Sequence, residues 1–258
     1  MLAILGTVSP PYGDRHSAKD FLDLMGNTQK YEVKTAILVD GGFYRKRASI
    51  LFGNMQPCER ADELEKYCLM HLHDKYEHRY LYRIFYYDCP PVKSNAFMPL
   101  GGKTVNLGKT PLYSWSNEFI NELKHRRKFA LRMGKISEEQ LHYTLRYDAL
   151  KRLLNGRIAI RDLEEKDFEL NVEQKGVDMR IGVDISSLAF KRQVNQIVLI
   201  SGDSDFVPAA KQARREGIDF ILDPMGASIK DDLFEHIDGI RSNVSKMFKN
   251  KNEQRTAS

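Results

Sequence analysis

The sequence predicts an α/β fold in which helices cover both faces of a central, mainly parallel sheet. Short apolar runs with the composition of buried strands, such as 35–40 and 196–201, alternate with segments of helical spacing. Strands that alternate with helices pair in parallel, because each helix returns the chain to the same end of the sheet. At 258 residues and 42% hydrophobic content, the chain can form one domain with a sizeable core.

The first part of the predicted domain contains two strands and two helices. Residues 35–40 predict the first strand, and the glycines at 41–42 allow a tight turn into a helix at 43–51. A second helix is expected over 58–75. The aromatic and β-branched run 81–88 predicts the next strand.

The middle of the chain is less regular. Residues 92–113 form a predicted loop, and a loop of that length in a compact domain is either functional or disordered. Two basic helices are expected at 116–133 and 137–154. Short strands are expected at 157–161 and 168–172.

Alternation returns near the C-terminus. We expect a helix at 178–192, a strand at 196–201, a helix at 205–215 and a strand at 218–222. A final short helix is predicted to start near residue 229.

These elements suggest three parts. Residues 1–33 are expected to be an N-terminal extension with a short helix at 17–25. Residues 34–240 are expected to form the main domain, with an inserted loop and helices at about 92–155. Residues 241–258 are expected to form a polar C-terminal tail.

Composition narrows the class of protein. The 40 Lys and Arg residues exceed the 35 Asp and Glu residues, which points weakly to a nucleic-acid partner. The three cysteines form no CxxC pair and are odd in number, so we expect no disulfide framework and a reducing, cytoplasmic setting. No apolar run approaches the roughly 20 residues of a membrane span, and the N-terminus lacks a basic leader, so we expect neither a membrane partner nor a signal peptide.

Acidic residues stand at the ends of predicted strands and at a helix start. Asp40 ends the first strand, Asp203 follows the strand at 196–201, and Asp178 begins a helix. The carboxyl ends of parallel strands meet at one edge of a sheet. Mg²⁺ and Mn²⁺ prefer oxygen ligands, usually a few carboxylates with water or phosphate. The three acids therefore predict a shared divalent-metal site that serves phosphate chemistry.

Other acids near these positions have two interpretations each. Asp205 is a fourth ligand or a helix cap, and any one acid alone is equally well explained as a cap or a solvated turn. Asp184 lies six residues after Asp178, about a third of a turn around the helix. It either supports the metal site or holds a neighbouring Arg. Asp88 also ends a strand, but the prolines that follow are expected to turn it away.

The series of motifs resembles an NYN domain of the LabA-like group, within the PIN-like nuclease superfamily. The motifs are Val39–Tyr44, Tyr86–Asp88, Gln174–Asp178, Val183–Asp184 and Ser201–Pro208. The resemblance covers about residues 34–225. It implies a three-layer α/β/α PIN-like fold and a metal-dependent ribonuclease of endoribonuclease-like type that uses Mg²⁺ or Mn²⁺.

The resemblance also assigns roles. Asp40, Asp178 and Asp203 resemble the catalytic, metal-binding acids, with Asp184 and Asp205 in support. One position departs from the family pattern. The Asn that usually follows the acid of the first strand is absent, since Gly42 and Phe43 stand there, which puts that contact in doubt.

Substrate contacts are expected from residues beside these acids. Arg45 and Lys46 open the helix after Asp40, and Lys175 precedes Asp178, so these cations are expected to bind RNA phosphates. Ser201 and Ser204 donate hydrogen bonds to the ligand, orient an acid or structure their turn. For the cations, the alternative is an ordinary solvated helix face. The sequence also leaves a homodimer open.

Rival functions remain at the level of sequence. The stretch Gly101–Thr104 lacks the earlier glycine of a phosphate loop, and His71 and His73 do not share a helix face for zinc. A haloacid-dehalogenase-type phosphatase needs a second Asp two residues after its nucleophile, where Gly42 stands. The main alternative is a catalytically silent RNA-binding or regulatory module on the same fold.

Overall fold

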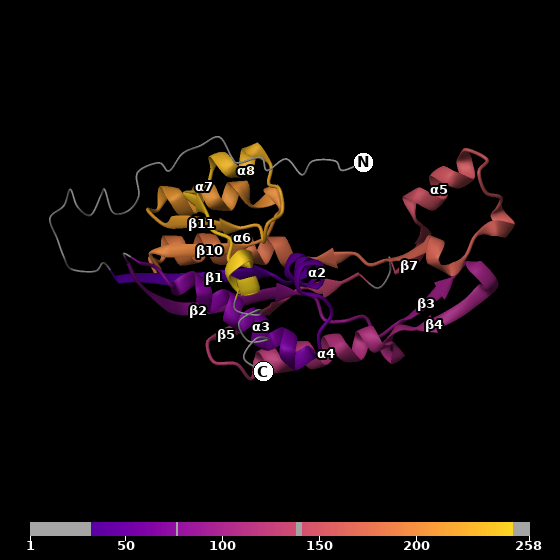
Figure 1. Ribbon diagram of the computed structural model, residues 1–258, viewed down its shortest axis with the longest axis horizontal. Coiled ribbons are helices and arrows are strands. Elements are labelled where there is room, and N and C mark those ends of the chain that lie inside the picture. The colour runs from indigo at the N-terminus through magenta and orange to yellow at the C-terminus, as the bar shows by residue number, and fades with distance from the viewer. Residues whose placement is uncertain (1–31, 76, 138–140, 250–258) are drawn as a thin grey trace.

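The computed structural model describes residues 32–75, 77–137 and 141–249 (Figure 1). Most of the expected N-terminal extension, with its helix at 17–25, lies outside the described residues. The centre is a six-stranded sheet in which every neighbouring pair is parallel. Its strands, in spatial order, are β12 (Gly239–Ile240), β11 (Asp219–Asp223), β10 (Gln196–Ile200), β1 (Glu32–Asp40), β2 (His78–Asp88) and β5 (Phe129–Met133).

Helices cover both faces of this sheet. One face packs against α2 (Gly41–Phe52), α3 (Pro57–Leu69) and α4 (Pro111–Lys124). The other packs against α6 (Val177–Phe190), α7 (Val207–Arg215) and α8 (Asp231–Glu235). The predicted three-layer α/β/α architecture is confirmed.

The central strand explains why its sequence is apolar without interruption. Ala36 and Leu38 of β1 point into the core beneath α6, whereas Ile37 and Val39 point into the core beneath α2 and α3. All four side chains are fully buried. A strand covered on both faces needs apolar residues at every position rather than at alternate ones.

The order of the strands reverses at β1. The chain passes from β1 through α2 and α3 to β2 on one side, and β10 later pairs with the other side of β1. From β10 the chain continues through a short 3₁₀ turn, η7 (Ser204–Phe206), into α7 on the opposite face from α2. Such a reversal opens a crevice beyond the carboxyl ends of the two strands, which is where open α/β sheets bind ligands.

A second body of small elements extends beyond this carboxyl edge. We call the described residues of 92–110 and 135–175 the insertion lobe. It contains three antiparallel strand pairs and helix α5 (Tyr147–Leu154), and it lies to the right of the sheet in Figure 1. The pairs are β3 (Asn95–Met98) with β4 (Lys103–Asn106), β6 (Lys135–Ile136) with β9 (Gln174–Lys175), and β7 (His142–Leu145) with β8 (Phe168–Asn171). Besides η7, the described chain contains further short 3₁₀ turns. One, η1 (Met70–Leu72), follows α3 in the main domain. The others lie in the insertion lobe: η2 (Leu100–Gly102), η3 (Leu107–Lys109), η5 (Ile160–Asp162) and η6 (Glu165–Asp167).

Four predictions for this middle region are wrong. The loop expected over 92–113 contains the paired strands β3 and β4. The helix expected at 116–133 ends at Lys124, and the last five residues form β5, a strand of the main sheet. The helix expected at 137–154 is a strand over 142–145 and helical only from Tyr147. The strand expected at 157–161 is instead a turn with η5. Pairing with β2 and β8 overrides the local helical pattern, because a paired strand satisfies its backbone groups without helical spacing.

The end of the described chain also differs from the expected polar tail. Met247 is buried against the α2–α3 face, and Val244 packs against the same core. The ring of Phe248 lies 5.4 Å from that of Phe52. Residues 241–249 therefore belong to the packed domain, because the side chains of Val244, Met247 and Phe248 all pack against the α2–α3 face.

Two adjacent glycines give a direct test of packing at the start of α2. A Cβ on Gly41 would lie 2.5 Å from the ring of Tyr86 and 2.6 Å from the carbonyl oxygen of Tyr87, whereas the nearest atom to a Cβ on Gly42 is 3.6 Å away. We expect Gly41→Ala to lower the free energy of unfolding by about 1–3 kcal/mol through overpacking. We expect Gly42→Ala to be neutral or stabilising by up to about 1 kcal/mol. Chemical denaturation of both variants measures the difference, and equal effects would contradict this account.

Candidate functional site

Asp40 is fixed at the carboxyl end of β1 by two hydrogen bonds. Its Oδ1 accepts the backbone N–H of Phe43 at 3.1 Å and so caps the N-terminus of α2. Its Oδ2 accepts the hydroxyl of Ser201 at 3.2 Å. The carboxylate is thus held at the point where the strand order reverses.

Ser201 connects Asp40 to the acidic loop after β10. The residue is fully buried, and its Oγ accepts the backbone N–H of Asp203 at 3.3 Å. Asp203 in turn caps η7, because its Oδ1 accepts the N–H of Asp205 at 3.1 Å. A Cβ on Gly202 would lie 2.7 Å from the ring of Phe43, so only glycine lets this loop rest on that ring. Ser201 therefore bonds both to an acid and within its own turn, and a contact with the ligand stays a prediction.

Asp178 reaches the same edge from the first turn of α6. Gly176 precedes this helix with φ of 77°, a left-handed conformation that glycine adopts without steric penalty, and it turns the chain sharply into the helix. The side chains of Asp178, Asp203 and Asp205 are exposed, whereas Asp40 is half-buried. Helix α6 therefore adds an accessible acid above the anchored one.

The charges of these acids act on one another. Burial raises the pKa of Asp178, and the negative charges of Asp203 and Asp205 raise it further. Burial also raises the pKa of Asp40, where the bonds from Phe43 and Ser201 lower it and the charge of Asp178 raises it. The structure thus brings together four predicted residues, Asp40, Asp178, Asp203 and Asp205, which we call the acidic cluster.

The acidic cluster fits an open site for a divalent cation better than a closed one. Within the described part of the chain, no Lys or Arg forms an ion pair with any of its four carboxylates. Among the same residues, no three His, Cys, Asp or Glu side chains lie close enough to hold a metal ion by themselves. Mg²⁺ usually keeps several waters and takes one or two carboxylates together with phosphate oxygens. The oxygen-only donor set, and the absence of ion pairs to it among the described residues, fit that pattern.

Asp184 faces away from the acidic cluster. Its Oδ2 accepts the hydroxyl of Tyr87 at 2.8 Å and the Nε–H of Arg132 at 2.9 Å. The second interpretation of this residue, an acid that holds a neighbouring Arg, agrees with these contacts. The nearby carboxylate also raises the pKa of Tyr87, which burial raises most.

Asp88 is a strand-end acid that sequence reasoning assigned to loop structure. It is almost fully buried and accepts the Tyr86 hydroxyl at 2.9 Å, the Cys89 N–H at 2.8 Å and Arg45 Nη2 at 3.0 Å. Its charge contributes to the raised pKa of Asp40. The prolines that follow do not turn Asp88 away from the carboxyl edge of the sheet. The sequence feature that indicates this position is that Asp88 ends a strand, and that strand lies beside β1.

The predicted substrate-binding residues have different surroundings. Arg45 donates to Asp88 and, through Nε, to the carbonyl of Gly41 at 3.4 Å, so part of its guanidinium is already used. Lys46 is exposed on α2. Lys175 lies in β9, 3.5 Å from Glu173. Ser204 Oγ accepts a hydrogen bond from Lys230 Nζ at 3.1 Å, which places beside the acidic loop a cation that no sequence motif indicates.

Comparison with known proteins supports this assignment of the fold. Residues 117–235 match the family model of the NYN domain. This NYN match contains Asp178, Asp203 and Asp205, whereas Asp40 precedes it. The NYN domain belongs to the PIN-like nuclease superfamily, and the three-layer architecture is consistent with a PIN-like fold.

The other comparisons name no function. No curated protein matches this sequence. A crystal structure of a protein of unknown function from Vibrio parahaemolyticus is similar, with 15% sequence identity over 84% of this chain and 96% of that chain and a TM-score of 0.44.

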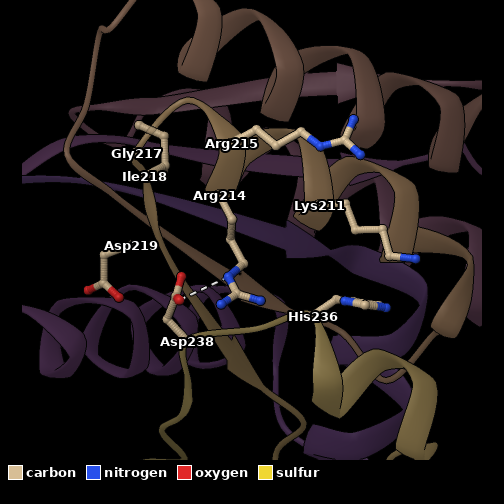
Figure 2. Close-up of a pocket in the computed structure, with 8 residues that line it drawn as sticks. All are labelled: Lys211, Arg214, Arg215, Gly217, Ile218, Asp219, His236 and Asp238. Atoms are coloured by element: carbon tan, nitrogen blue, oxygen red, sulfur yellow. Dashed lines mark hydrogen bonds and ion pairs between the residues drawn. The ribbon is translucent and has the colours of Figure 1, made fainter.

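A further hollow is separate from the acidic cluster. It has a volume of about 770 Å³ and lies where α7 ends and β11 begins, at the amino end of that strand (Figure 2). Arg214 and Arg215 contribute positive charge, but Arg214 Nε already donates to Asp238 at 2.9 Å. The hollow and the acidic cluster therefore occupy opposite ends of the strands.

Two further expectations concern location and assembly. None of the helices in the described ranges is long and apolar enough to cross a membrane. A cytoplasmic location stays a prediction. The homodimer that the sequence leaves open gains no support from these comparisons.

Burial of Asp178, together with repulsion from Asp203 and Asp205, predicts a pH-dependent stability. The pKa of Asp178 in the folded protein lies above its ordinary value of 3.8, so folding disfavours the ionised form. Without metal at pH 7, we expect Asp178→Asn to be more stable than the unmodified protein by less than about 1 kcal/mol, since water screens this exposed group. The gain is present above the raised pKa and disappears as the pH falls through it. Denaturation at pH 7 and near pH 4 tests this, and a gain of equal size at both would contradict it.

Proposed function

We propose that this protein is a metal-dependent ribonuclease of the LabA-like group that hydrolyses RNA phosphodiester bonds in an endoribonuclease-like manner. The acidic cluster supports the proposal most directly. Its carboxylates come from three separate elements at the carboxyl edge of the sheet, and the charge of one affects the pKa of another. The NYN match adds a superfamily of nucleases whose NYN members typically act on RNA.

In this proposal Asp40, Asp178 and Asp203 hold Mg²⁺ or Mn²⁺, with Asp205 in support. A bound divalent ion would activate water and stabilise the leaving oxygen of the phosphodiester. Asp40 presents a fixed carboxylate, because the Phe43 N–H and the Ser201 hydroxyl each hold one of its oxygens. We leave Asp184 out of the ligand set, since Tyr87 and Arg132 already occupy its carboxylate.

The substrate phosphates would contact cations around the same edge. Lys46 and Lys175 are exposed, and the guanidinium of Arg45 is about a quarter exposed beside Asp88. Lys230 and Ser204 form a bonded pair next to Asp203, from which the ammonium group could donate to a phosphate oxygen. Such contacts give affinity and position without reading the base sequence. In this account Ser201 orients Asp40 rather than contacting RNA.

The alternative is an RNA-binding or regulatory module that has lost turnover. Two observations favour keeping it: Gly42 and Phe43 replace the usual Asn, and no preformed three-residue metal group exists among the described residues. Both functions require RNA binding, and only the nuclease requires metal-dependent cleavage.

Metal binding can be measured without any substrate. We expect Mn²⁺ or Mg²⁺ to stabilise the folded chain by about 2.7 kcal/mol when its concentration is 100 times the dissociation constant. Asp203→Asn should lose this gain, because one ligand is removed, while Asp148→Asn, an exposed acid on α5, should keep it. Thermal unfolding with metal or EDTA gives the answer. If both variants respond like the unmodified protein, the acidic cluster is not the metal site.

Cleavage decides between the two functions. We expect labelled single-stranded or hairpin RNA to be cleaved with Mn²⁺ or Mg²⁺ and not with EDTA. Asp203→Asn should lower the rate at least about a hundredfold while RNA is still bound, as for loss of a group that stabilises the transition state. Asp148→Asn is the matched control. Binding of RNA with no cleavage under any metal condition would reject the nuclease and favour the silent module.

A further inference from the structure

Two neighbouring hollows beside the acidic cluster share Arg45 and Leu112. The larger, about 410 Å³, is bounded by Ser49 of α2, Met55 and Trp115. The smaller, about 210 Å³, lies where the insertion lobe meets the main domain. We call the two hollows together the Arg45 groove.

The walls of the Arg45 groove are mainly apolar. Pro91, Tyr113, Leu170 and Val172 bound the smaller hollow, and they come from the end of β2, from α4 and from the insertion lobe. Apolar walls with a few placed polar groups are typical of sites that bind small organic groups. Arg45 supplies the positive charge that both hollows share.

The Arg45 groove is continuous with the carboxyl edge of the sheet. Arg45 donates to Asp88 at 3.0 Å, and the charges of Asp88 and Asp40 both act on Arg45. Cys89, the residue after Asp88, lines the smaller hollow. A chain whose phosphate lies at the acidic cluster would therefore have its neighbouring units beside the groove.

One aromatic ring in the groove is fixed in advance. The indole of Trp115 stacks on Phe119 with centroids 5.1 Å apart and planes 18° from parallel. Its Nε1 donates to the carbonyl of Met55 at 2.9 Å. A ring held from one face and by its N–H loses little freedom when a ligand packs against it. Base stacking on such rings contributes affinity in single-strand binding proteins with little dependence on sequence.

We propose that the Arg45 groove binds unpaired nucleobases of a single-stranded RNA segment next to the phosphate at the acidic cluster. This inference rests on the proposed function, and it adds a preference for single strands over duplexes. Bases in a duplex are stacked and paired, so they cannot enter two hollows with apolar walls. The combination of flat apolar surface and one shared cation matches a base with its attached phosphate.

The groove can be observed directly, because Trp115 is the single tryptophan of the chain. We would titrate the 258-residue protein in EDTA with a short single-stranded oligoribonucleotide, its duplex and an abasic chain of equal length. We expect the single strand to quench Trp115 fluorescence and the duplex and abasic chain to leave it largely unchanged. Equal quenching by the abasic chain would overturn the inference, since phosphates alone would then explain it.

Two exposed leucines give a matched pair of variants. Leu112 in the groove is 71% exposed, and Leu154 on α5 is 77% exposed, so replacing either with Glu leaves the core intact and adds the same charge. We expect Leu112→Glu to weaken single-strand binding roughly tenfold, comparable to losing one stacked base. Leu154→Glu should bind like the unmodified protein. Equal weakening by both variants would overturn the inference, since general charge repulsion would then be the cause.

The remaining outcomes separate this inference from the proposed function. If RNA is not cleaved but the fluorescence quenching and the two leucine variants behave as expected, the proposed nuclease activity is rejected and base binding in the Arg45 groove is supported. If RNA is cleaved and Leu112→Glu changes neither the affinity for RNA nor KM, base binding in the Arg45 groove is rejected while the proposed nuclease activity is kept. No binding of any RNA would overturn the groove. A change in Trp115 fluorescence with protein concentration alone, confirmed by sedimentation, would assign the groove to a second copy and also overturn it.

Discussion

The hydrogen bond from Ser201 to Asp40 joins the two strand ends at which the sheet reverses its order. One hydroxyl fixes the acid of β1 and, by accepting the N–H of Asp203, the loop after β10. The close contacts of Gly41 with β2 and of Gly202 with Phe43 hold the same two loops from the other side. Because both loops follow buried stretches of their strands, their carboxylates are presented on a rigid edge rather than on flexible connections.

The acids at the carboxyl edge are of two kinds, which differ in the side chains that bond to them. Asp88 is enclosed by donors and paired with Arg45, and Asp223 at the end of β11 accepts the Tyr67 hydroxyl at 2.7 Å in a fully buried setting. These acids stabilise the ends of their strands. The four acids of the acidic cluster form no ion pair within the described residues, and the pKa values of Asp40 and Asp178 are raised, chiefly by burial and further by neighbouring carboxylates. Charge held together against repulsion is typical of a functional site rather than of a stabilising one.

The insertion lobe and the acidic cluster lie at the same edge of the sheet. Both inserted segments leave the sheet from the carboxyl ends of β2 and β5, so the lobe stands on the same side as the acids (Figure 1). Arg45 lies between them: it is bonded to Asp88 and lines both hollows of the Arg45 groove. The chemistry proposed at the edge and the base recognition proposed in the groove are therefore linked through one guanidinium.

The sequence alone determined the parallel α/β architecture and the position of Asp40 and Asp203 at strand ends, because continuous apolar runs and the residues that end them are local signals. It did not determine β5, whose five half-buried residues become a strand only by pairing with β2. Nor did it decide between the two roles of Asp184, and it wrongly expected Asp88 to be turned away from the edge. Their partners, Arg132 and Arg45, lie 52 and 43 residues away, and such pairings exist only once the chain has folded. Local patterns fix which residues are buried and where strands end, whereas the tertiary structure decides which charges meet a partner.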